Sequence, residues 1–244
     1  MRCSQNNLNK NSQNNTMIGL FDYTLFINLE DRVDRLIQVR TELTKWGIQN
    51  PERFNAVKMA NGAVGCSMSH IKCLELAKER NYPYVFICED DIQCVDIPKM
   101  LKMMSDFYKT HGETDTWDVL LVGGNNAPPY RILNEGIMQA YNCQCTVGYI
   151  VRRHYYNKLI SNFRDGVKQL MRNPEKHREF AVDMYWKRLQ QEDRWLMLLP
   201  LTITQRNSYS DIEGKEVDYS RMMLDHEKRW MQMQMRNMAY VNKA

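Results

Sequence analysis

The chain has 244 residues, of which 43% are hydrophobic and 25% are charged, values that are ordinary for a soluble globular domain. Its formal net charge of +4 is mild and mixed in sign, which suits an anionic small molecule and argues against a nucleic-acid partner. No apolar run is long enough to span a bilayer, and the first residues lack the apolar core of a signal peptide. We therefore expect a soluble, cytoplasmic protein without a transmembrane segment.

Three regions differ in composition. Residues 1–17 are rich in Asn and Gln and are predicted to form a disordered tail. Residues 18–215 are predicted to form one domain, and the Met-rich residues 216–244 a helix that covers its core, with a partner-binding surface as the alternative. Seven cysteines at irregular spacing do not indicate a disulfide framework, so we expect reduced thiols.

Strands and helices alternate along the domain. The predicted elements, in chain order, are a strand at 23–29, a helix in 31–48 that Gly47 ends, a helix at 67–80, a strand at 84–88, a helix at 98–108, a strand at 117–122 closed by Gly123 and Gly124, a hairpin before 144, a strand at 146–151, helices at 155–163 and 183–191, and a strand at 196–203. This alternation predicts an α/β domain with a mixed, mainly parallel sheet flanked by helices.

An acidic triplet, Glu89-Asp90-Asp91, ends the buried strand at 84–88. Three adjacent carboxylates repel each other, and their partial burial costs free energy unless a cation compensates. Open α/β sheets bind ligands at the carboxyl ends of their strands, and oxygen ligands favour Mn²⁺ or Mg²⁺. Glu89 and Asp91 share one face of the extended triplet, so we expect them to hold the metal. The alternative is a solvated acidic turn.

A series of short motifs in a fixed order resembles glycosyltransferase family 25, which includes lipooligosaccharide and collagen galactosyltransferases. The motifs run from Tyr23 to Ile212: Ile27-Asn28-Leu29 with Arg32 and Arg35, Gly65-Cys66-Ser67-Met68-Ser69-His70-Ile71, Glu89-Asp90-Asp91, Leu121 to Gly123, Thr146-Val147-Gly148-Tyr149, Val182-Asp183, and Pro200, Gln205 and Ser210-Asp211-Ile212. Each motif alone is weak, but their order is hard to obtain by chance.

The resemblance implies a GT-A-like fold, a UDP-sugar donor, Mn²⁺ and inversion at the anomeric carbon. UDP-galactose is the expected donor and UDP-glucose the alternative. The expected acceptor is a hydroxyl of a glycan, as in lipopolysaccharide biosynthesis, or a hydroxylysine of a collagen-like polypeptide. A non-catalytic sugar-nucleotide or glycan-binding module on the same fold is the competing interpretation. The oligomeric state stays open.

The resemblance also assigns donor-binding residues. These are Asn28, Arg32, Arg35, Gly65, Ser69, His70, Asp90, Gly148, Tyr149 and Gln205. Arg32 and Arg35 are expected near the diphosphate, with surface pairing to Glu30, Asp31 or Asp34 as the alternative. Ser69 and His70 are expected near a helix N-terminus, which favours anions. Gly65 is expected to let backbone approach the ligand, and Gly148 with Tyr149 to line the sugar pocket, or Gly148 to mark a strand bulge.

Inversion requires a base that takes the proton of the acceptor hydroxyl as its oxygen attacks. Asp183 is the first candidate because it holds the position of the family's Asp after the Gly-Tyr strand. Its alternative role is a helix N-cap. Asp211 is the second candidate for the base, or a further metal ligand.

Overall fold

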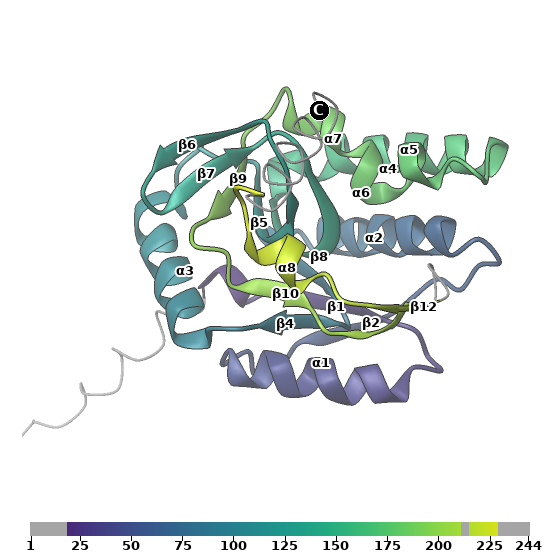
Figure 1. Cartoon of the computed structure of the whole chain (residues 1–244), viewed down its shortest axis with the longest axis horizontal. Coiled ribbons are helices and arrows are strands. Elements are labelled where there is room, and N and C mark those ends of the chain that lie inside the picture. The colour runs from purple at the N-terminus through teal and green to yellow at the C-terminus, as the bar shows by residue number, and fades with distance from the viewer. Residues whose placement is uncertain (1–18, 211–214, 229–244) are drawn as a thin grey trace, which may run out of the picture.

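The computed structural model of the chain describes residues 19–210 and 215–228 (Figure 1). The helices are η1 Gly19–Phe21, α1 Val33–Lys45, α2 Gly62–Glu79, α3 Ile97–His111, η2 Arg153–Tyr155, α4 Tyr156–Arg172, α5 His177–Phe180, α6 Val182–Tyr185, α7 Lys187–Gln190 and α8 Ser220–Leu224. The strands are β1 Thr24–Asn28, β2 Glu52–Asn55, β3 Tyr84–Glu89, β4 Ile92–Cys94, β5 Val119–Asn126, β6 Tyr130–Asn134, β7 Ile137–Ala140, β8 Cys143–Arg152, β9 Trp195–Leu198, β10 Ile203–Gln205, β11 Ser208–Ser210 and β12 Lys215–Val217.

Eight strands form one central sheet in the order β2-β1-β3-β8-β5-β9-β7-β6. Helices cover both of its faces, with α1 and α3 on one side and α2 and α4 on the other (Figure 1). This confirms the α/β class and the mixed sheet. The sheet is not mainly parallel, however, because β8 lies antiparallel between β3 and β5, and the β6–β7 hairpin extends the far edge; three pairings are parallel and four are antiparallel.

Alternation along the strands divides the core into two clusters. Leu25 and Ile27 of β1 face the cluster under α2 and α4, whereas Phe26 faces the cluster under α1 and α3. All five residues of β1 are buried, as expected for a strand inside a two-sided sheet. Both faces are therefore occupied by helices, and only the strand ends are left for a ligand.

The register brings two strand ends together. Strand β1 pairs in parallel with β3, with Ile27 opposite Glu89, so Asn28 and the acidic triplet emerge at the same edge. The antiparallel strand β8 has Gly148 opposite Cys88, which carries Thr146 toward the same edge. After the triplet, β4 forms a two-stranded ribbon with β10, and Gln205 lies opposite Ile92.

Some predicted boundaries are wrong. Helix α2 begins at Gly62 rather than Ser67, because the side chain of Asn61 accepts hydrogen bonds from the backbone of Ala63 and Val64 and caps the helix. Strand β5 continues through the two glycines at 123–124. The segment predicted as one strand at 196–203 forms β9 and β10 in different sheets, and the helix predicted at 183–191 is divided into α6 and α7.

The structure describes only part of the two ends of the chain. Residues 1–18 and 229–244 lie outside the described ranges, so the predicted tail and most of the predicted Met-rich helix fall there. Within 215–228, α8 packs Met223 into the core under α1 and α3. The six cysteines that the structure describes are free thiols. In these ranges no helix combines the length and the apolar character that crossing a membrane requires.

Candidate active site

A cavity of about 370 Å³ opens at the carboxyl ends of β1 and β3. Residues from the loop after β2, from α2, from β10 and from the segment 217–219 complete its wall. The wall carries four basic and four acidic side chains, which are Arg32, Arg35, Lys58 and Arg206, and Asp31, Glu89, Asp90 and Asp91. Such mixed charge is suited to an anionic ligand that is held together with a cation.

Asp90 is held by two side chains that precede it in the sequence. Its Oδ2 accepts a hydrogen bond from Asn28 Nδ2 at 2.7 Å, and its Oδ1 accepts one from Arg35 Nη1 at 3.1 Å. Burial raises the pKa of Asp90, and these two partners oppose that shift. Asn28 is itself 1% exposed. Asp90 therefore fixes the end of β1 and α1 against the acidic triplet.

Asp91 has weaker compensation. Gln205 Nε2 donates to its Oδ2 at 3.3 Å, and Arg35 Nη1 lies 3.9 Å away. Burial, followed by the charges of Glu89 and Asp90, raises the pKa of Asp91 to about 8. The described residues thus compensate a charge on Asp91 only in part, so the carboxyl holds its proton at neutral pH unless a bound cation favours its ionised form.

Glu89 is better stabilised than Asp91. Its Oε1 accepts from Thr146 Oγ1 at 2.5 Å and from His70 Nε2 at 3.3 Å. Burial is the largest influence and raises the pKa of Glu89, but the hydrogen bonds from His70 and Thr146 and the positive charge of Arg35 bring the net pKa below its usual value. Glu89 is therefore ionised at neutral pH and available as an oxygen ligand.

Ser69 and His70 do not lie at a helix N-terminus, so their predicted position is wrong, whereas their donor-binding role stays a prediction. Because α2 starts at Gly62, both residues are two turns inside the helix. His70 lines the cavity beside Glu89. Ser69 accepts from Val57 N and donates to Gly65 O, both at 2.8 Å, and so fastens the loop after β2 to α2.

Three predicted donor-binding residues do not line the cavity. A Cβ on Gly65 would lie 2.4 Å from Val57 O, so this glycine allows a close approach of the chain to itself. Gly148 also has no room for a side chain, because the side chains of Ile92 and Phe86 pack closely against it. It lies opposite an irregularity in the register of β5, which supports the bulge alternative. Tyr149 is fully buried, and its hydroxyl forms a hydrogen bond with His70 Nδ1 at 2.8 Å.

The two arginines after β1 behave differently. Arg32 Nη2 pairs with Asp34 at 3.0 Å, which is the surface pairing named as an alternative, although Arg32 also lines the cavity. Arg35 points to Asp90 and Asp91 instead. Gln205 reaches the cavity beside Asp91, as expected for a residue of the site.

Asp183 lies beside the cavity but is not part of its wall. It is inside α6, whose N-cap is Ala181, so it is not the predicted N-cap. Its Oδ2 accepts from Cys145 N at 3.0 Å. Burial, together with the nearby charge of Glu89, raises the pKa of Asp183. The other candidate base, Asp211, lies outside the described residues.

Sequence reasoning missed several residues of the site. Lys58 and Arg206 carried no motif, and Thr146 was quoted only as part of a pattern, although it makes the shortest contact to Glu89. Arg206 could have been suspected from the sequence because it directly follows Gln205, which had been assigned to the site.

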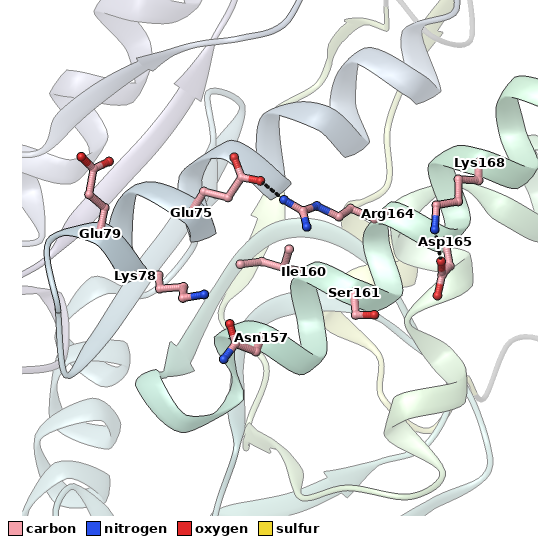
Figure 2. A pocket seen from close by; sticks show the side chains of 9 residues that line it. All are labelled: Glu75, Lys78, Glu79, Asn157, Ile160, Ser161, Arg164, Asp165 and Lys168. Atoms are coloured by element: carbon pink, nitrogen blue, oxygen red, sulfur yellow. Dashed lines mark hydrogen bonds and ion pairs between the residues drawn. The ribbon is translucent and has the colours of Figure 1, made fainter.

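A second hollow, of about 490 Å³, lies between α2 and α4, away from the strand ends (Figure 2). Four of its charged side chains form two ion pairs. Arg164 Nη2 lies 2.6 Å from Glu75 Oε1, and Lys168 Nζ lies 2.9 Å from Asp165 Oδ1, as the dashed lines of Figure 2 show. Because these charges are already compensated and exposed, we assign no ligand to this hollow.

The polar groups of the site gather at the carboxyl ends of the strands, where open α/β sheets bind their ligands. Residues 49–119, which include Ser69, His70 and the acidic triplet, match the family model of glycosyltransferase family 25, described as LPS biosynthesis protein. Over these residues, the match confirms the resemblance seen in the sequence. No curated protein matches the chain.

Solved structures with similar chain traces share little sequence with this protein. A mannose-1-phosphate geranyltransferase from Thermus thermophilus is 7% identical, with a TM-score of 0.38, over 72% of this chain and 58% of that one. A mutant β-1,4-galactosyltransferase 7 from Drosophila, in complex with manganese, UDP-Gal and xylobiose, is 16% identical, with a TM-score of 0.34, over 57% and 52%. A glycosyltransferase involved in glycosylation of the major capsid of PBCV-1 is 8% identical, with a TM-score of 0.43, over 72% and 80%. The chain thus spans 58% and 52% of the lengths of the first two.

Proposed function

We propose that the protein transfers a hexose from a UDP-sugar to an acceptor hydroxyl in a reaction that depends on a divalent cation. Galactose is the proposed sugar, with glucose as the alternative, and the acceptor is a glycan or a collagen-like hydroxylysine. The observation that carries the proposal is the cluster of three carboxylates at a strand end on the cavity wall, where Asp91 is only partly buried but, among the described residues, has just a 3.3 Å hydrogen bond from Gln205 and Arg35 at 3.9 Å as partners.

The cavity wall supports a nucleotide-diphosphate ligand. Arg32, Lys58 and Arg206 line it, and cationic side chains attract and hold phosphate oxygens. Arg35 is assigned to a different task, because its guanidinium faces Asp90 and Asp91 and keeps the acidic triplet in place. In this proposal Arg32, Lys58 and Arg206 orient the diphosphate beside the acidic triplet.

The donor atoms at the triplet fit a hard cation such as Mn²⁺ or Mg²⁺. The pKa of Glu89 is lowered, that of Asp91 is raised by burial and by the charges of Glu89 and Asp90, and both side chains offer carboxyl oxygens to the cavity. We propose these two residues as the ligands, with Asp90 holding the triplet in place. When bound, such an ion supplies charge stabilisation to the departing diphosphate.

Asp183 is the proposed base for an inverting transfer. Its raised pKa makes it a better proton acceptor than an ordinary surface aspartate, and Cys145 N holds one of its oxygens in place. The proton would pass from the acceptor hydroxyl to the carboxylate as the hydroxyl oxygen attacks the anomeric carbon. Asp211 is the alternative base.

The test is release of the nucleoside diphosphate from a panel of UDP- and GDP-sugars, with Mn²⁺ or with a chelator. We expect release from one UDP-hexose that the chelator stops. Asp91→Ala should abolish turnover in a folded protein, whereas Asp165→Ala, which removes an exposed carboxylate in the second hollow, should not. Full activity of Asp91→Ala, or release that the chelator does not change, would show that the assigned metal site is wrong.

A second experiment addresses the base. Asp183→Asn should lower the rate of transfer by about 10²- to 10⁴-fold, the usual contribution of a general base, while donor binding stays near that of the wild type. Equal losses of transfer and donor binding would point to Asp211 as the base, or to a structural role for Asp183 through Cys145.

A further inference from the structure

Two side chains beside Glu89, one of the proposed Mn²⁺ ligands, are of a different chemical kind, a thiol and an imidazole. Cys66, His70 and Glu89 each offer one ligand atom, and these atoms lie within 4.8 Å of one another. Cys66 and His70 are four residues apart on α2, so they project from the same face of the helix. We propose that they form, with Glu89, an open three-ligand site for Zn²⁺ or a similar borderline cation.

The distances are close to those of a tetrahedral zinc site. With metal–ligand distances of about 2.0 Å to nitrogen and oxygen and about 2.3 Å to sulfur, the ligand atoms are about 3.3 Å (N to O) and about 3.5 Å (S to O) apart. Here His70 Nε2 lies 3.3 Å and Cys66 Sγ 4.0 Å from Glu89 Oε1. A shift of about half an ångström at Cys66 would bring its sulfur to the expected distance from Glu89 Oε1.

The fourth position of the tetrahedron is open. Cys66, His70 and Glu89 all line the cavity of about 370 Å³, so water or another small ligand can reach an ion held among them. Three protein ligands and one exchangeable position are typical of open zinc sites, whereas closed structural sites use four protein ligands.

Tyr149 supplies the outer support that metal-binding histidines generally have. Its hydroxyl lies 2.8 Å from His70 Nδ1. Without metal, the carboxylate of Glu89 can only accept, so His70 donates from Nε2 and Tyr149 donates to Nδ1. With zinc on Nε2 the ring proton moves to Nδ1, and the Tyr149 oxygen accepts it. A hydroxyl serves both states because it can donate or accept, and it fixes the plane of the ring in each.

The ligand set distinguishes this site from the proposed Mn²⁺ site. A thiolate and an imidazole select zinc, cobalt or cadmium over Mn²⁺ and Mg²⁺, which prefer oxygen. Binding releases the Cys66 thiol proton to solvent, because the thiolate is the ligand form. The site needs no sugar and no turnover, so it stands or fails separately from the proposed function. Glu89 belongs to both sites, so one ion at a time can use it fully.

The test is direct binding of Zn²⁺ and Co²⁺ to chelator-treated, reduced full-length protein. Zinc affinity is measured by competition with a chromogenic chelator, and Co²⁺ reports a thiolate ligand through its sulfur-to-cobalt charge-transfer absorption. Cys66→Ser should lose that absorption and weaken zinc binding by at least about 100-fold. Cys73→Ala should retain both, since Cys73 is a buried thiol of α2 outside the cluster.

Tyr149→Phe provides a second variant with all three ligands intact. We expect it to keep the cobalt–thiolate absorption and to bind zinc about 10- to 100-fold more weakly. A wild-type protein without the charge-transfer absorption would overturn the proposal without any variant. So would a folded Cys66→Ser protein, checked by circular dichroism, with the zinc affinity of the wild type.

Discussion

The raised pKa of Asp91 has a consequence for stability that can be measured in the metal-free protein. In the unfolded chain this carboxyl has a pKa of 3.8, and in the fold burial and the charges of Glu89 and Asp90 raise it to about 8. Between these values the folded state holds one proton more than the unfolded state, so the free energy of unfolding falls as the pH rises. Each pH unit is worth about 1.4 kcal/mol, so from pH 5 to pH 7 the loss reaches at most about 3 kcal/mol.

Asp91→Asn removes this titration while keeping the size of the side chain. The assay is urea unfolding of wild type and variant in the presence of a chelator, at pH 5, 6 and 7. The wild type should lose up to about 3 kcal/mol more than the variant across this range, and added Mn²⁺ should reduce that difference. Asp165→Asn, which changes the formal charge equally at an exposed position, should follow the wild type. If the stabilities of wild type and Asp91→Asn changed in parallel with pH, the raised pKa of Asp91 would be refuted.

Two further predictions concern the contacts that shape the site. Gly65→Ala places a Cβ 2.4 Å from Val57 O and should destabilise the protein by about 1–3 kcal/mol in urea unfolding. Gly136→Ala, whose Cβ would meet nothing closer than 3.8 Å, should be nearly neutral, and equal effects would contradict the packing role. Thr146→Val removes the 2.5 Å hydrogen bond to Glu89 and should raise the Mn²⁺ concentration for half-maximal activity about 10- to 100-fold. An unchanged Mn²⁺ requirement would exclude Glu89 as a supported ligand.

Local patterns predicted most of the fold because its core elements carry strong signals. The apolar run at 84–88 and the helical spacing after the first strand became β3 and α1. The start of α2 was misplaced because its first turn, Gly62-Ala63-Val64-Gly65, looks unfavourable for a helix. The cap that stabilises it comes from the side chain of Asn61, and a cap outweighs a weak propensity.

The site could be predicted only where a motif marked it. The acidic triplet at a strand end was visible in the sequence, and the structure places it at the cavity. The contacts that set its chemistry join residues far apart, such as Thr146 with Glu89 and Asp183 with Cys145. These contacts depend on β8 lying antiparallel beside β3, and a pattern of strands and helices that suggested a mainly parallel sheet does not contain that information.

The ribbon of β4 and β10 makes assembly of the site a late event in synthesis. Gln205 reaches Asp91 only when β10 has paired with β4, and Arg206 N then donates to Asp91 O at 2.7 Å. A nascent chain that has left the ribosome only as far as residue 119 contains the whole family-matched segment but lacks Thr146, Gln205 and Arg206. Its three carboxylates would repel each other without these partners, so residues 49–119 do not contain all the side chains that line or support the cavity.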